Sequence, residues 1–318
     1  MRIAVDVMGS DHGPQELIAG ALKWVQEKQG HVFLVGPSSM IQEELKQYDY
    51  DASLVSIAEA AQVIAMNESP ALALRKKKDA SIVVATKLVK EGMADAVISC
   101  GSTGAQMAAA LFILGRLEGI ERPPIVANIP GLNDQYSLLM DVGANVDCKP
   151  QQMVQFALLG KVYSKIIMGI HNPRIALLSN GQEETKGNNQ SLETYNLLQE
   201  QKELNFIGNI EGRDLFNHKG DVIVCDGFVG NVVLKTIEGM AGFIAGNIIK
   251  ESGSLPKFFK KLDYTQVGGA PLLGINGVSI VCHGSSKSEA VYNGMNVAEQ
   301  CYNSRIVEIQ QEELLKFI

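Results

Sequence analysis

Short apolar runs rich in β-branched residues alternate along the chain with longer segments of helical periodicity. Nine such runs occur, at residues 2–6, 31–36, 95–100, 124–129, 138–142, 174–179, 205–210, 222–226 and 278–282. Because these runs are apolar on both faces, they suit strands that are covered by helices on both sides of a sheet. The pattern therefore predicts an α/β protein with a doubly wound, largely parallel sheet in an α/β/α sandwich.

The spacing of these runs gives no reason to divide the chain. No low-complexity tract, fixed-period repeat or Pro/Ser-rich linker interrupts it, so we expect a single domain over residues 1–318. One segment departs from the strand and helix alternation. Residues 239–263 lead from an apolar stretch through Gly253 and Pro256 into a basic, aromatic one, which predicts a helical hairpin that protrudes from the domain.

Small polar loops follow six of the predicted strands. Their sequences are VMGSDHGP, GSTGAQ, GANVD, NGQEETKGN, GFVGN and HGSSKS. In open parallel sheets, ligands bind outside the carboxyl ends of the strands, where such loops converge. Any one of these loops, taken alone, is explained better by ordinary turn and helix-cap chemistry. Six together predict one composite binding site.

Charge excludes one class of function. The chain has 28 Lys and Arg against 35 Asp and Glu, a formal net charge of −7, whereas a general nucleic-acid binder needs a basic field. A compact basic run, RKKK at residues 75–78, is either a solvated face or a dock for an acidic partner. A second basic group, Lys257, Lys260 and Lys261 beside two phenylalanines, could bind a membrane surface.

Cysteine usage and hydropathy indicate a cytoplasmic protein. The five cysteines are scattered without CxxC spacing, as in proteins of a reducing compartment. The first residues, MRIAVDVMGSD, place an acid at position 6 and so lack the apolar core of a signal peptide. Because no stretch approaches 18 uninterrupted apolar residues, we expect no membrane span.

The sequence lacks the motifs of several common enzyme and metal-site classes. The chain contains no GxGxxG, no G-x4-GK[ST], no HExxH, no GxSxG and no paired CxxC. Dinucleotide, P-loop, zincin, hydrolase-elbow and zinc-ribbon interpretations are therefore disfavoured, and we expect neither a metal nor a cofactor. A phosphate or acyl site of another kind remains.

Two residues are the strongest candidates for that chemistry. Lys186 lies in a Gly/Asn-rich loop just past a strand, where its charge and nearby N–H groups can hold a phosphate oxygen or an oxyanion. The alternative is a solvated lysine paired with Glu183 or Glu184. Asn231 follows the strand that ends in Asp226, and its amide can donate to an oxyanion, although an N-cap asparagine would look the same.

The other loops offer hydroxyls and one imidazole. Ser102 and Thr103 open a helix after GST, which suits an anion cradle or a simple cap. His283, in HGSS, could donate to phosphate or assist a leaving group, although a lone histidine at a strand end is more often structural.

Taken in order, the motifs DVMGSDHGP, GSTGA, DVGANVDCKP, GQEETKGN, DGFVGNVVLKTIEG and HGSSKS closely resemble the PlsX family of bacterial phosphate acyltransferases, from residue 1 to about residue 305. The resemblance implies a fold like that of phosphotransacetylases and isocitrate-type dehydrogenases. It also implies the reaction of inorganic phosphate with long-chain acyl carrier protein, which gives an acyl phosphate for a membrane glycerol-phosphate acyltransferase of phospholipid synthesis. Members of the family are typically homodimers that associate peripherally with the membrane.

The same resemblance assigns residues to roles. Lys186 and Asn231 are the implied catalytic pair, with Lys186 holding phosphate or the oxyanion and Asn231 donating beside it. The phosphate and thioester pocket would be shaped by Gly9, Ser10, Asp11, Ser102, Thr103, Asn145, Gly230, His283, Ser285 and Ser286. The attacking phosphate is already anionic near pH 7, so catalysis would rest on orientation and oxyanion stabilisation.

Four alternatives compete with this interpretation. One is a phosphotransacetylase-type enzyme that uses a short acyl-CoA. Another is a non-catalytic organiser of lipid enzymes on the membrane surface, which would use the 239–263 hairpin and the basic patches. A third is an acyl-enzyme on Cys100 or Cys225, disfavoured because neither has a histidine adjacent in sequence. A dehydrogenase, the last, lacks a nicotinamide fingerprint and a metal-binding acid cluster.

Overall fold

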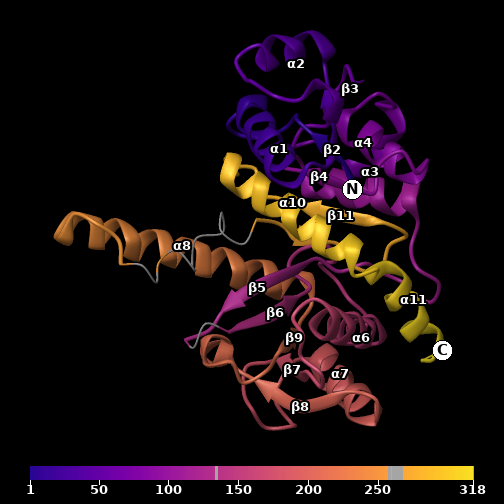
Figure 1. Cartoon of the computed structure of the whole chain (residues 1–318). Helices are drawn as coiled ribbons and strands as arrows, with labels where there is room; N and C mark the ends of the chain where they lie inside the picture. The colour runs from indigo at the N-terminus through magenta and orange to yellow at the C-terminus, as the bar shows by residue number, and fades with distance from the viewer. Residues whose placement is uncertain (133–134, 257–258, 260–267, 318) are drawn as a thin grey trace. The chain divides into compact units, whose positions relative to one another are not determined.

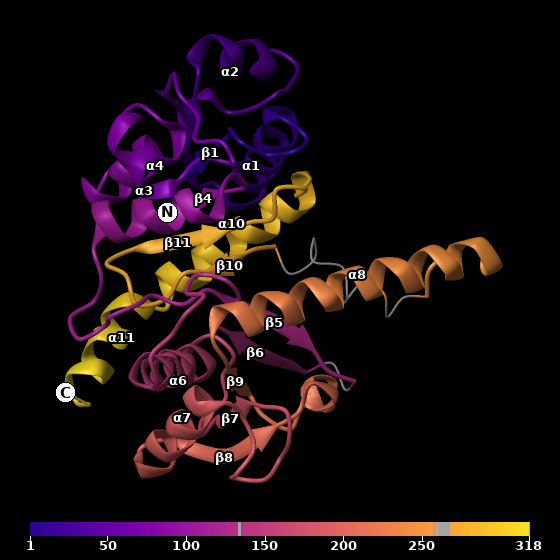
Figure 2. The same cartoon turned by 180° about the vertical axis from the view of Figure 1, so that it is seen from behind.

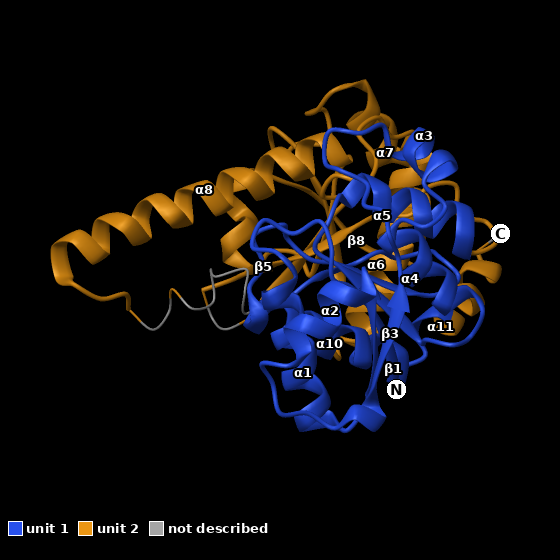
Figure 3. Cartoon of the chain, turned by 90° about the horizontal axis from the view of Figure 1, so that it is seen from above, with its two compact units in different colours: residues 1–116, 264–307 blue, residues 117–263, 308–318 orange. Residues whose placement is uncertain are grey.

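The computed structural model describes residues 1–132, 135–256, 259 and 268–317 (Figure 1). The contacts within the chain group its residues into two compact units (Figure 3). Unit 1 comprises residues 1–116 and 264–307, and unit 2 comprises residues 117–263 and 308–318. Each unit has its own sheet and is described by itself, and the expectation of a single domain stays a prediction.

Unit 1 is built on a six-stranded sheet in the order β10-β11-β4-β1-β2-β3. Its strands are β1 Arg2–Asp6, β2 His31–Gly36, β3 Val55–Glu59, β4 Ala96–Ser99, β10 Ala270–Pro271 and β11 Val278–Val281. All neighbours pair in parallel except β10, which runs antiparallel to β11. The carboxyl ends of β1, β4 and β11 therefore lie at the same edge of the sheet.

Helices cover both faces of this sheet. They are α1 Pro14–Lys28, α2 Ser38–Leu45, α3 Pro70–Lys76, α4 Ser81–Lys90, α5 Thr103–Ala109 and α10 Ser288–Asn303, with a 3₁₀ turn at Ala52–Leu54 and a π turn at Ala110–Leu114 that continues α5. Ala4 and Val97 are buried in a cluster with residues of α3, α4 and α5. On the other face, α1 packs against α10 so closely that a Cβ on Gly20 would lie 2.5 Å from the Ser288 carbonyl oxygen.

Unit 2 contains a five-stranded sheet in the order β5-β6-β9-β7-β8, parallel except for the β5–β6 hairpin. Its strands are β5 Val126–Pro130, β6 Tyr136–Met140, β7 Arg174–Leu178, β8 Asn205–Ile210 and β9 Val222–Val224. Its helices are α6 Pro150–Ile166, α7 Asn189–Glu200 and α8 Gly227–Ser252, with a 3₁₀ turn at Gly212–Asn217. The boundary between the units also falls inside α11 Ile306–Leu315.

The predicted α/β class and largely parallel strands are confirmed, and each of the nine predicted runs contains a strand. The strands are divided between two sheets. Two strands were missed, β3 and β10. β3 is half-exposed at the sheet edge, and β10 has only two residues, so neither has the continuous apolar pattern of a central strand.

The predicted hairpin at 239–263 needs a correction. Its first arm belongs to the 26-residue helix α8, which starts at Gly227 and ends where Gly253 takes a left-handed conformation with φ 77°. Residues 257–258 and 260–267, with the predicted membrane-binding lysines, lie outside the described residues. Figures 1 and 2 show α8 extending away from the strands of unit 2.

Candidate active site

The start of α8 positions Asn231. Asp226 caps the helix, because its carboxylate accepts a hydrogen bond from the Val229 N–H at 2.9 Å. Asn231 therefore lies inside the helix and is not its N-cap, which removes that alternative. Its exposed side chain lies against Gly143, where an added Cβ would be 3.4 Å from Asn231 Cβ and Cγ. The amide is left available to a ligand.

Glycines allow the first turn of α8 to approach the loop after β6. An added Cβ on Gly230 would lie only 1.9 Å from the Asp141 carbonyl oxygen, so no side chain fits there. The Gly227 N–H donates to the Asn145 carbonyl at 2.8 Å. The sequence predicted Gly230 as a pocket residue, and the structure shows it permitting a close backbone contact that fixes the helix start.

Asp141 organises this loop from within the core. Its buried carboxylate accepts hydrogen bonds from the backbone N–H groups of Ile125 at 3.0 Å, Ala144 at 3.1 Å and Asn145 at 2.6 Å. Burial raises the pKa of Asp141, and these hydrogen bonds act in the opposite direction. The sequence analysis missed this residue, although an acid directly after an apolar strand was a visible signal.

Asn145 is tied into the same network. Its Nδ2 donates to Asp141 Oδ2 and to the Pro123 carbonyl, each at 2.9 Å. Its Oδ1 is buried with no hydrogen-bond partner among the described residues. Because both amide hydrogens are engaged, Asn145 supports the loop, and its predicted contact with substrate stays a prediction.

The loop of Lys186 joins β7 to α7. Asn188 caps α7 through a hydrogen bond from the Ser191 N–H at 2.8 Å, and the Lys186 N–H donates to the Glu183 carbonyl at 3.0 Å. The aliphatic part of Lys186 crosses Gly181, where an added Cβ would lie 2.6 Å from Lys186 Cγ.

The Lys186 side chain is exposed. Across the described part of the chain, no carboxylate lies within ion-pair distance of its ammonium. The alternative of a lysine paired with Glu183 or Glu184 is therefore not what the structure shows. Glu184 accepts instead from the hydroxyl of Tyr195, whose pKa is raised first by burial and then by this carboxylate.

A cavity of about 400 Å³ lies between this loop and the start of α8. It is lined by Met153, Leu178, Ser179, Asn180, Gly187, Asn188, Gln190, Ser191, Cys225, Asp226 and Val229. Gly187 follows Lys186, and Val229 precedes Asn231 by two residues, so both candidate catalytic residues belong to segments that form its wall. Cys225 reaches this wall, but burial raises the pKa of its thiol well above the ordinary value, which disfavours a nucleophilic thiolate.

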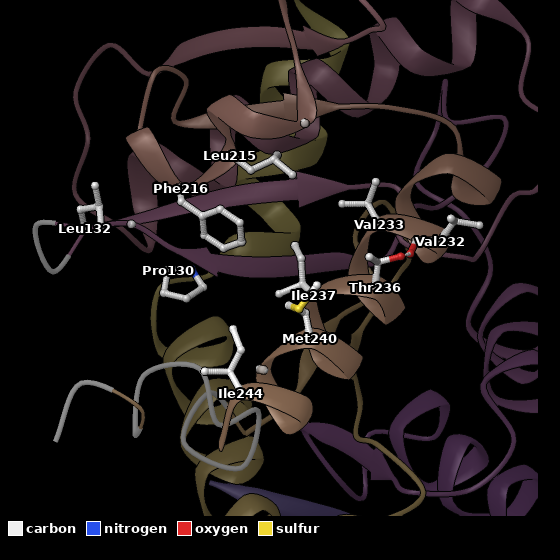
Figure 4. Close-up of a pocket in the computed structure, with 13 residues that line it drawn as sticks. Pro130, Leu132, Leu215, Phe216, Val232, Val233, Thr236, Ile237, Met240 and Ile244 are labelled. Atoms are coloured by element: carbon white, nitrogen blue, oxygen red, sulfur yellow. Dashed lines mark hydrogen bonds between the residues drawn. The ribbon is translucent and has the colours of Figure 1, made fainter. Parts of the chain in front are cut away.

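A second, apolar cavity of about 670 Å³ begins directly after Asn231 (Figure 4). It runs between α8, the β5–β6 hairpin and the 3₁₀ turn, and is lined by Pro130, Gly131, Leu132, Gly212, Leu215, Phe216, Val232, Val233, Thr236, Ile237, Met240, Ala241 and Ile244. Among the described residues of this lining, only Thr236 has a polar side chain, and its hydroxyl donates to the Val232 carbonyl at 2.7 Å. The sequence analysis did not anticipate this cavity.

In unit 1, three of the predicted loops meet. The Asp11 N–H donates to the Gly284 carbonyl at 2.8 Å, which joins the loop after β1 to the loop after β11. Gly9 has φ 81° and approaches the loop after β4, where its Cβ would lie 3.1 Å from the Gly101 Cα. The backbone of all three loops is thereby fixed at one edge of the sheet.

Asp6, the last residue of β1, anchors the loops after β1 and β4. Its buried carboxylate accepts hydrogen bonds from Ser99 Oγ at 2.8 Å and from the Met8 N–H at 3.1 Å, and Ser99 Oγ accepts in turn from the Gly101 N–H at 3.1 Å. Burial raises the pKa of Asp6 to about 6, against the effect of these hydrogen bonds. Like Asp141 in unit 2, Asp6 is a strand-end acid that the sequence analysis missed.

The candidate side chains of unit 1 differ in their hydrogen bonds and in their exposure to solvent. Ser102 caps α5 by accepting from the Ala105 N–H at 3.4 Å, whereas Thr103 is exposed. His283 Nδ1 and Ser285 Oγ are 2.6 Å apart. Ser286 Oγ is buried and has no partner among the described residues.

The candidate residues thus form two groups. Gly9, Ser10, Asp11, Ser102, Thr103, His283, Ser285 and Ser286 belong to unit 1, and Asn145, Lys186, Gly230 and Asn231 belong to unit 2. Within the described residues, no three His, Cys, Asp or Glu side chains are grouped as a metal site would require. The groups that the candidate residues offer for chemistry are the Lys186 ammonium, the His283 imidazole, the Asp11 carboxylate, side-chain amides, hydroxyls and backbone N–H groups.

Known proteins resemble this chain along its whole length. Residues 1–308 match the family described as fatty acid synthesis protein. A phosphate acyltransferase of Syntrophomonas wolfei is 65% identical over 317 residues, which is 99% of each chain. One of Desulfitobacterium hafniense is 50% identical over 333 residues, which cover 100% of this chain and 98% of the other.

A solved structure supports the fold. The phosphotransacetylase of Streptococcus pyogenes superposes with a TM-score of 0.65 at 18% identity, covering 97% of this chain and 94% of the other. At that identity the similarity concerns the fold alone, and it confirms the phosphotransacetylase-like architecture expected from the sequence.

Proposed function

The chain belongs to the fatty acid synthesis protein family and is a phosphate acyltransferase, and we propose that it transfers long-chain acyl groups from acyl carrier protein to inorganic phosphate. The acyl phosphate would then serve a membrane glycerol-phosphate acyltransferase in phospholipid synthesis. The choice of a long acyl chain rests on one observation, the apolar cavity that begins next to Asn231.

The size and lining of this cavity favour a long chain over an acetyl group. Each methylene that leaves water for such a surface contributes roughly 0.8 kcal/mol, so a long chain can use the whole cavity and an acetyl group almost none of it. The Thr236 hydroxyl is already satisfied within α8, so the described lining residues offer an acyl chain no unpaired polar side chain. Its position after Asn231 would place the thioester carbonyl beside the candidate amide.

The proposed chemistry uses the two candidate residues without a covalent enzyme intermediate. Lys186 would bind the phosphate anion and orient one oxygen toward the thioester carbonyl carbon. The new C–O bond forms, negative charge develops on the carbonyl oxygen, and Asn231 Nδ2 donates to it. The carbonyl re-forms as the C–S bond breaks, and the sulfur leaves with its electron pair and takes up the proton that the attacking hydrogen phosphate loses, which gives the free thiol of the carrier.

We also propose a homodimer that associates peripherally with a membrane from the cytoplasmic side. Helix α8 supports this, because only Gly227 and Gly230 of its residues are buried, while Met240 is 54% and Phe243 69% exposed. A long helix of this composition needs a covering surface in water. By length and a mean hydropathy of 1.4 it also passes as a membrane span, but Gly227 and Gly230 of its first turn are buried within unit 2.

The test compares acyl donors and a filled cavity. Phosphate-dependent thiol release is measured with palmitoyl carrier protein and with acetyl-CoA, and we expect palmitoyl carrier protein to react faster. An Ile237→Trp variant narrows the cavity and should lower kcat/KM for palmitoyl carrier protein at least about tenfold. The reason is that several methylenes of the palmitoyl chain no longer fit in the cavity and stay in water. Its effect on the butyryl carrier protein should be small.

The control variant is Phe243→Trp, which changes an exposed residue of the same helix that does not line the cavity. Light scattering checks that both variants keep the wild-type mass. Faster turnover of acetyl-CoA would favour the phosphotransacetylase-type alternative. Equal losses on palmitoyl and butyryl donors would remove the cavity from the acyl site, and a wild-type protein without activity would favour the non-catalytic organiser.

A further inference from the structure

The basic run at residues 75–78 divides into one structural lysine and three exposed cations. Lys77 turns inward, where its Nζ donates to the Val63 carbonyl at 2.7 Å and pairs with Glu68 at 2.6 Å. It thereby ties down the loop between β3 and α3. Arg75, Lys76 and Lys78 are exposed, so the run is not a uniform solvated face.

A fourth cation joins them from α4. Lys87 Nζ lies 3.5 Å from the Lys78 carbonyl oxygen, which brings the two lysines together on the surface. We call Arg75, Lys76, Lys78 and Lys87 the basic face. As far as the chain is described, none of the four pairs with a carboxylate within 4.0 Å. Clustered cations without counter-charges destabilise a fold slightly, and an acidic partner would relieve that cost.

The basic face lies close to the candidate loops of unit 1. Helix α3 begins against α5, since an added Cβ on Gly104 would be 2.7 Å from Pro70 Cγ (Figure 3). Gly104 directly follows the candidate residues Ser102 and Thr103. Six residues of helical rise, about 9 Å, separate Pro70 from Lys76. A carrier bound to the basic face could therefore reach these loops with its extended pantetheine arm.

An apolar contact accompanies the charges. Leu72 is 57% exposed and precedes Arg75 and Lys76 by three and four residues, so the three side chains share one side of α3. Interfaces commonly combine a buried apolar anchor with complementary charges around it. This arrangement fits a folded protein partner better than a dispersed polyanion.

We infer that the basic face docks the acidic surface of the carrier protein that delivers the acyl thioester, an inference that rests on the proposed function. Charge complementarity indicates an acidic partner surface, because the four cations cluster on a chain whose net charge is −7. Asp79, next to Lys78, and Glu68, which pairs with Lys77, place carboxylates beside the basic face that would oppose an extended polyanion such as nucleic acid. A compact acidic surface can meet the cations alone.

The experiment reverses charge on the basic face. Binding of fluorescently labelled holo acyl carrier protein is followed by anisotropy, and acyl phosphate formation from palmitoyl carrier protein is followed separately. The Lys76→Glu/Lys78→Glu variant should weaken binding and raise KM about tenfold at low salt, with little change in kcat. Raising the ionic strength should weaken binding to the wild type and affect the variant much less.

A matched control carries the same charge change elsewhere. Lys165→Glu/Lys202→Glu alters two exposed lysines outside the basic face and should bind the carrier within about twofold of the wild type. Vesicles of anionic lipid test the competing partner. If the basic-face variant loses vesicle binding but binds the carrier normally, the face is a membrane contact and the inference is wrong.

The remaining outcomes separate this inference from the proposed function. If wild-type protein makes acyl phosphate from palmitoyl carrier protein and the basic-face variant matches the control, docking is overturned and the function stands. If the carrier binds through the basic face but no acyl phosphate forms, docking stands and the function fails. Absence of carrier binding to the wild type overturns the docking inference outright.

Discussion

Lys186 presents an exposed ammonium in a loop whose backbone is fixed at both ends, by the turn at Glu183 and by the cap of α7. The Lys186→Ala substitution should lower kcat/KM by about 10²–10³, the loss typical of a group that stabilises developing charge. Lys186→Arg should retain part of the activity, because it keeps the charge but changes its geometry. Initial rates of acyl phosphate formation across phosphate concentrations measure both variants.

The control for this prediction is Lys202→Ala, another exposed lysine of unit 2. All variants should unfold at nearly the wild-type temperature, because the Lys186 ammonium makes no ion pair among the described residues. A folded Lys186→Ala protein with unchanged kcat/KM would remove Lys186 from the site.

Asp6 gives a prediction about pH. Burial raises its pKa from the ordinary 3.8 to about 6, so the folded state binds a proton more tightly than the unfolded state. The stability from this proton is fully present below the unfolded pKa and is lost as pH rises through the folded pKa. The free energy of unfolding should therefore fall by about 2 kcal/mol between pH 4 and pH 6.5 through this group.

Urea unfolding across this range tests the contribution of Asp6. In an Asp6→Asn variant the fall should be smaller by about that amount, since the amide cannot ionise. Asp49→Asn, at an exposed carboxylate, should leave the profile as it is in the wild type. A variant at position 6 with the wild-type pH profile would contradict the prediction.

At the residue scale, sequence reasoning identified the exposed candidates Lys186 and Asn231 and missed two acids that act from the core. Lys186 and Asn231 were identifiable because a cation or amide after a strand points to ligand chemistry by type and position. Asp6 and Asp141 were overlooked because their importance comes from burial and from N–H groups of neighbouring loops. The contact from Ser99 to Asp6 spans 93 positions and that from Ile125 to Asp141 spans 16, so local patterns do not display them.

At the element scale, the apolar runs predicted the central strands because buried parallel strands need apolar residues on both faces. The same reasoning placed the start of the protruding segment wrongly. Helix α8 begins at Gly227, and its glycines and asparagine looked like a loop because they suit close backbone approach. Helix propensity was overridden by the packing of Gly227 and Gly230 against the loop after β6.

Helix α8 itself should be poorly protected when the chain is alone. Beyond its first turn none of its residues is buried, and isolated helices in water are marginal. We expect amides of residues 240–252 to exchange rapidly with deuterium in dilute solution, and to gain protection as protein concentration rises through the range in which the proposed homodimer forms. Hydrogen exchange with mass spectrometry measures this difference.

Helix α6 is the internal reference for this measurement. Eleven of its residues are buried, so its amides should be protected at every concentration. Protection of residues 240–252 equal to that of α6 in the most dilute samples would show that α8 needs no covering partner, and would count against the homodimer surface proposed for it.

At the scale of the whole molecule, unit 1 is assembled from two separate stretches of chain. Residues 1–116 supply β1 to β4, whereas β10, β11 and α10 come from the segment after residue 264. β11 pairs with β4, and α10 packs on α1, where Lys23 and Lys28 pair with Glu289 and Glu299. The first stretch alone would expose β4 as a sheet edge and uncover one side of α1.

A fragment of residues 1–116 should therefore lack fixed tertiary structure. Removal of α10 uncovers apolar surface around Val291 and Met295, worth several kcal/mol at roughly 1.5–3 kcal/mol for each large side chain, in a domain stabilised by only about 5–15 kcal/mol. The sole tryptophan, Trp24, is fully buried in α1 and reports on this unit by fluorescence. We expect solvent-exposed emission and non-cooperative unfolding from the fragment.

A chain that joins residues 1–116 to 268–307 through a short Gly/Ser linker should recover the emission of the native protein and unfold cooperatively. If residues 1–116 alone bury Trp24 and unfold cooperatively, the second stretch is dispensable and unit 1 does not depend on its discontinuous assembly.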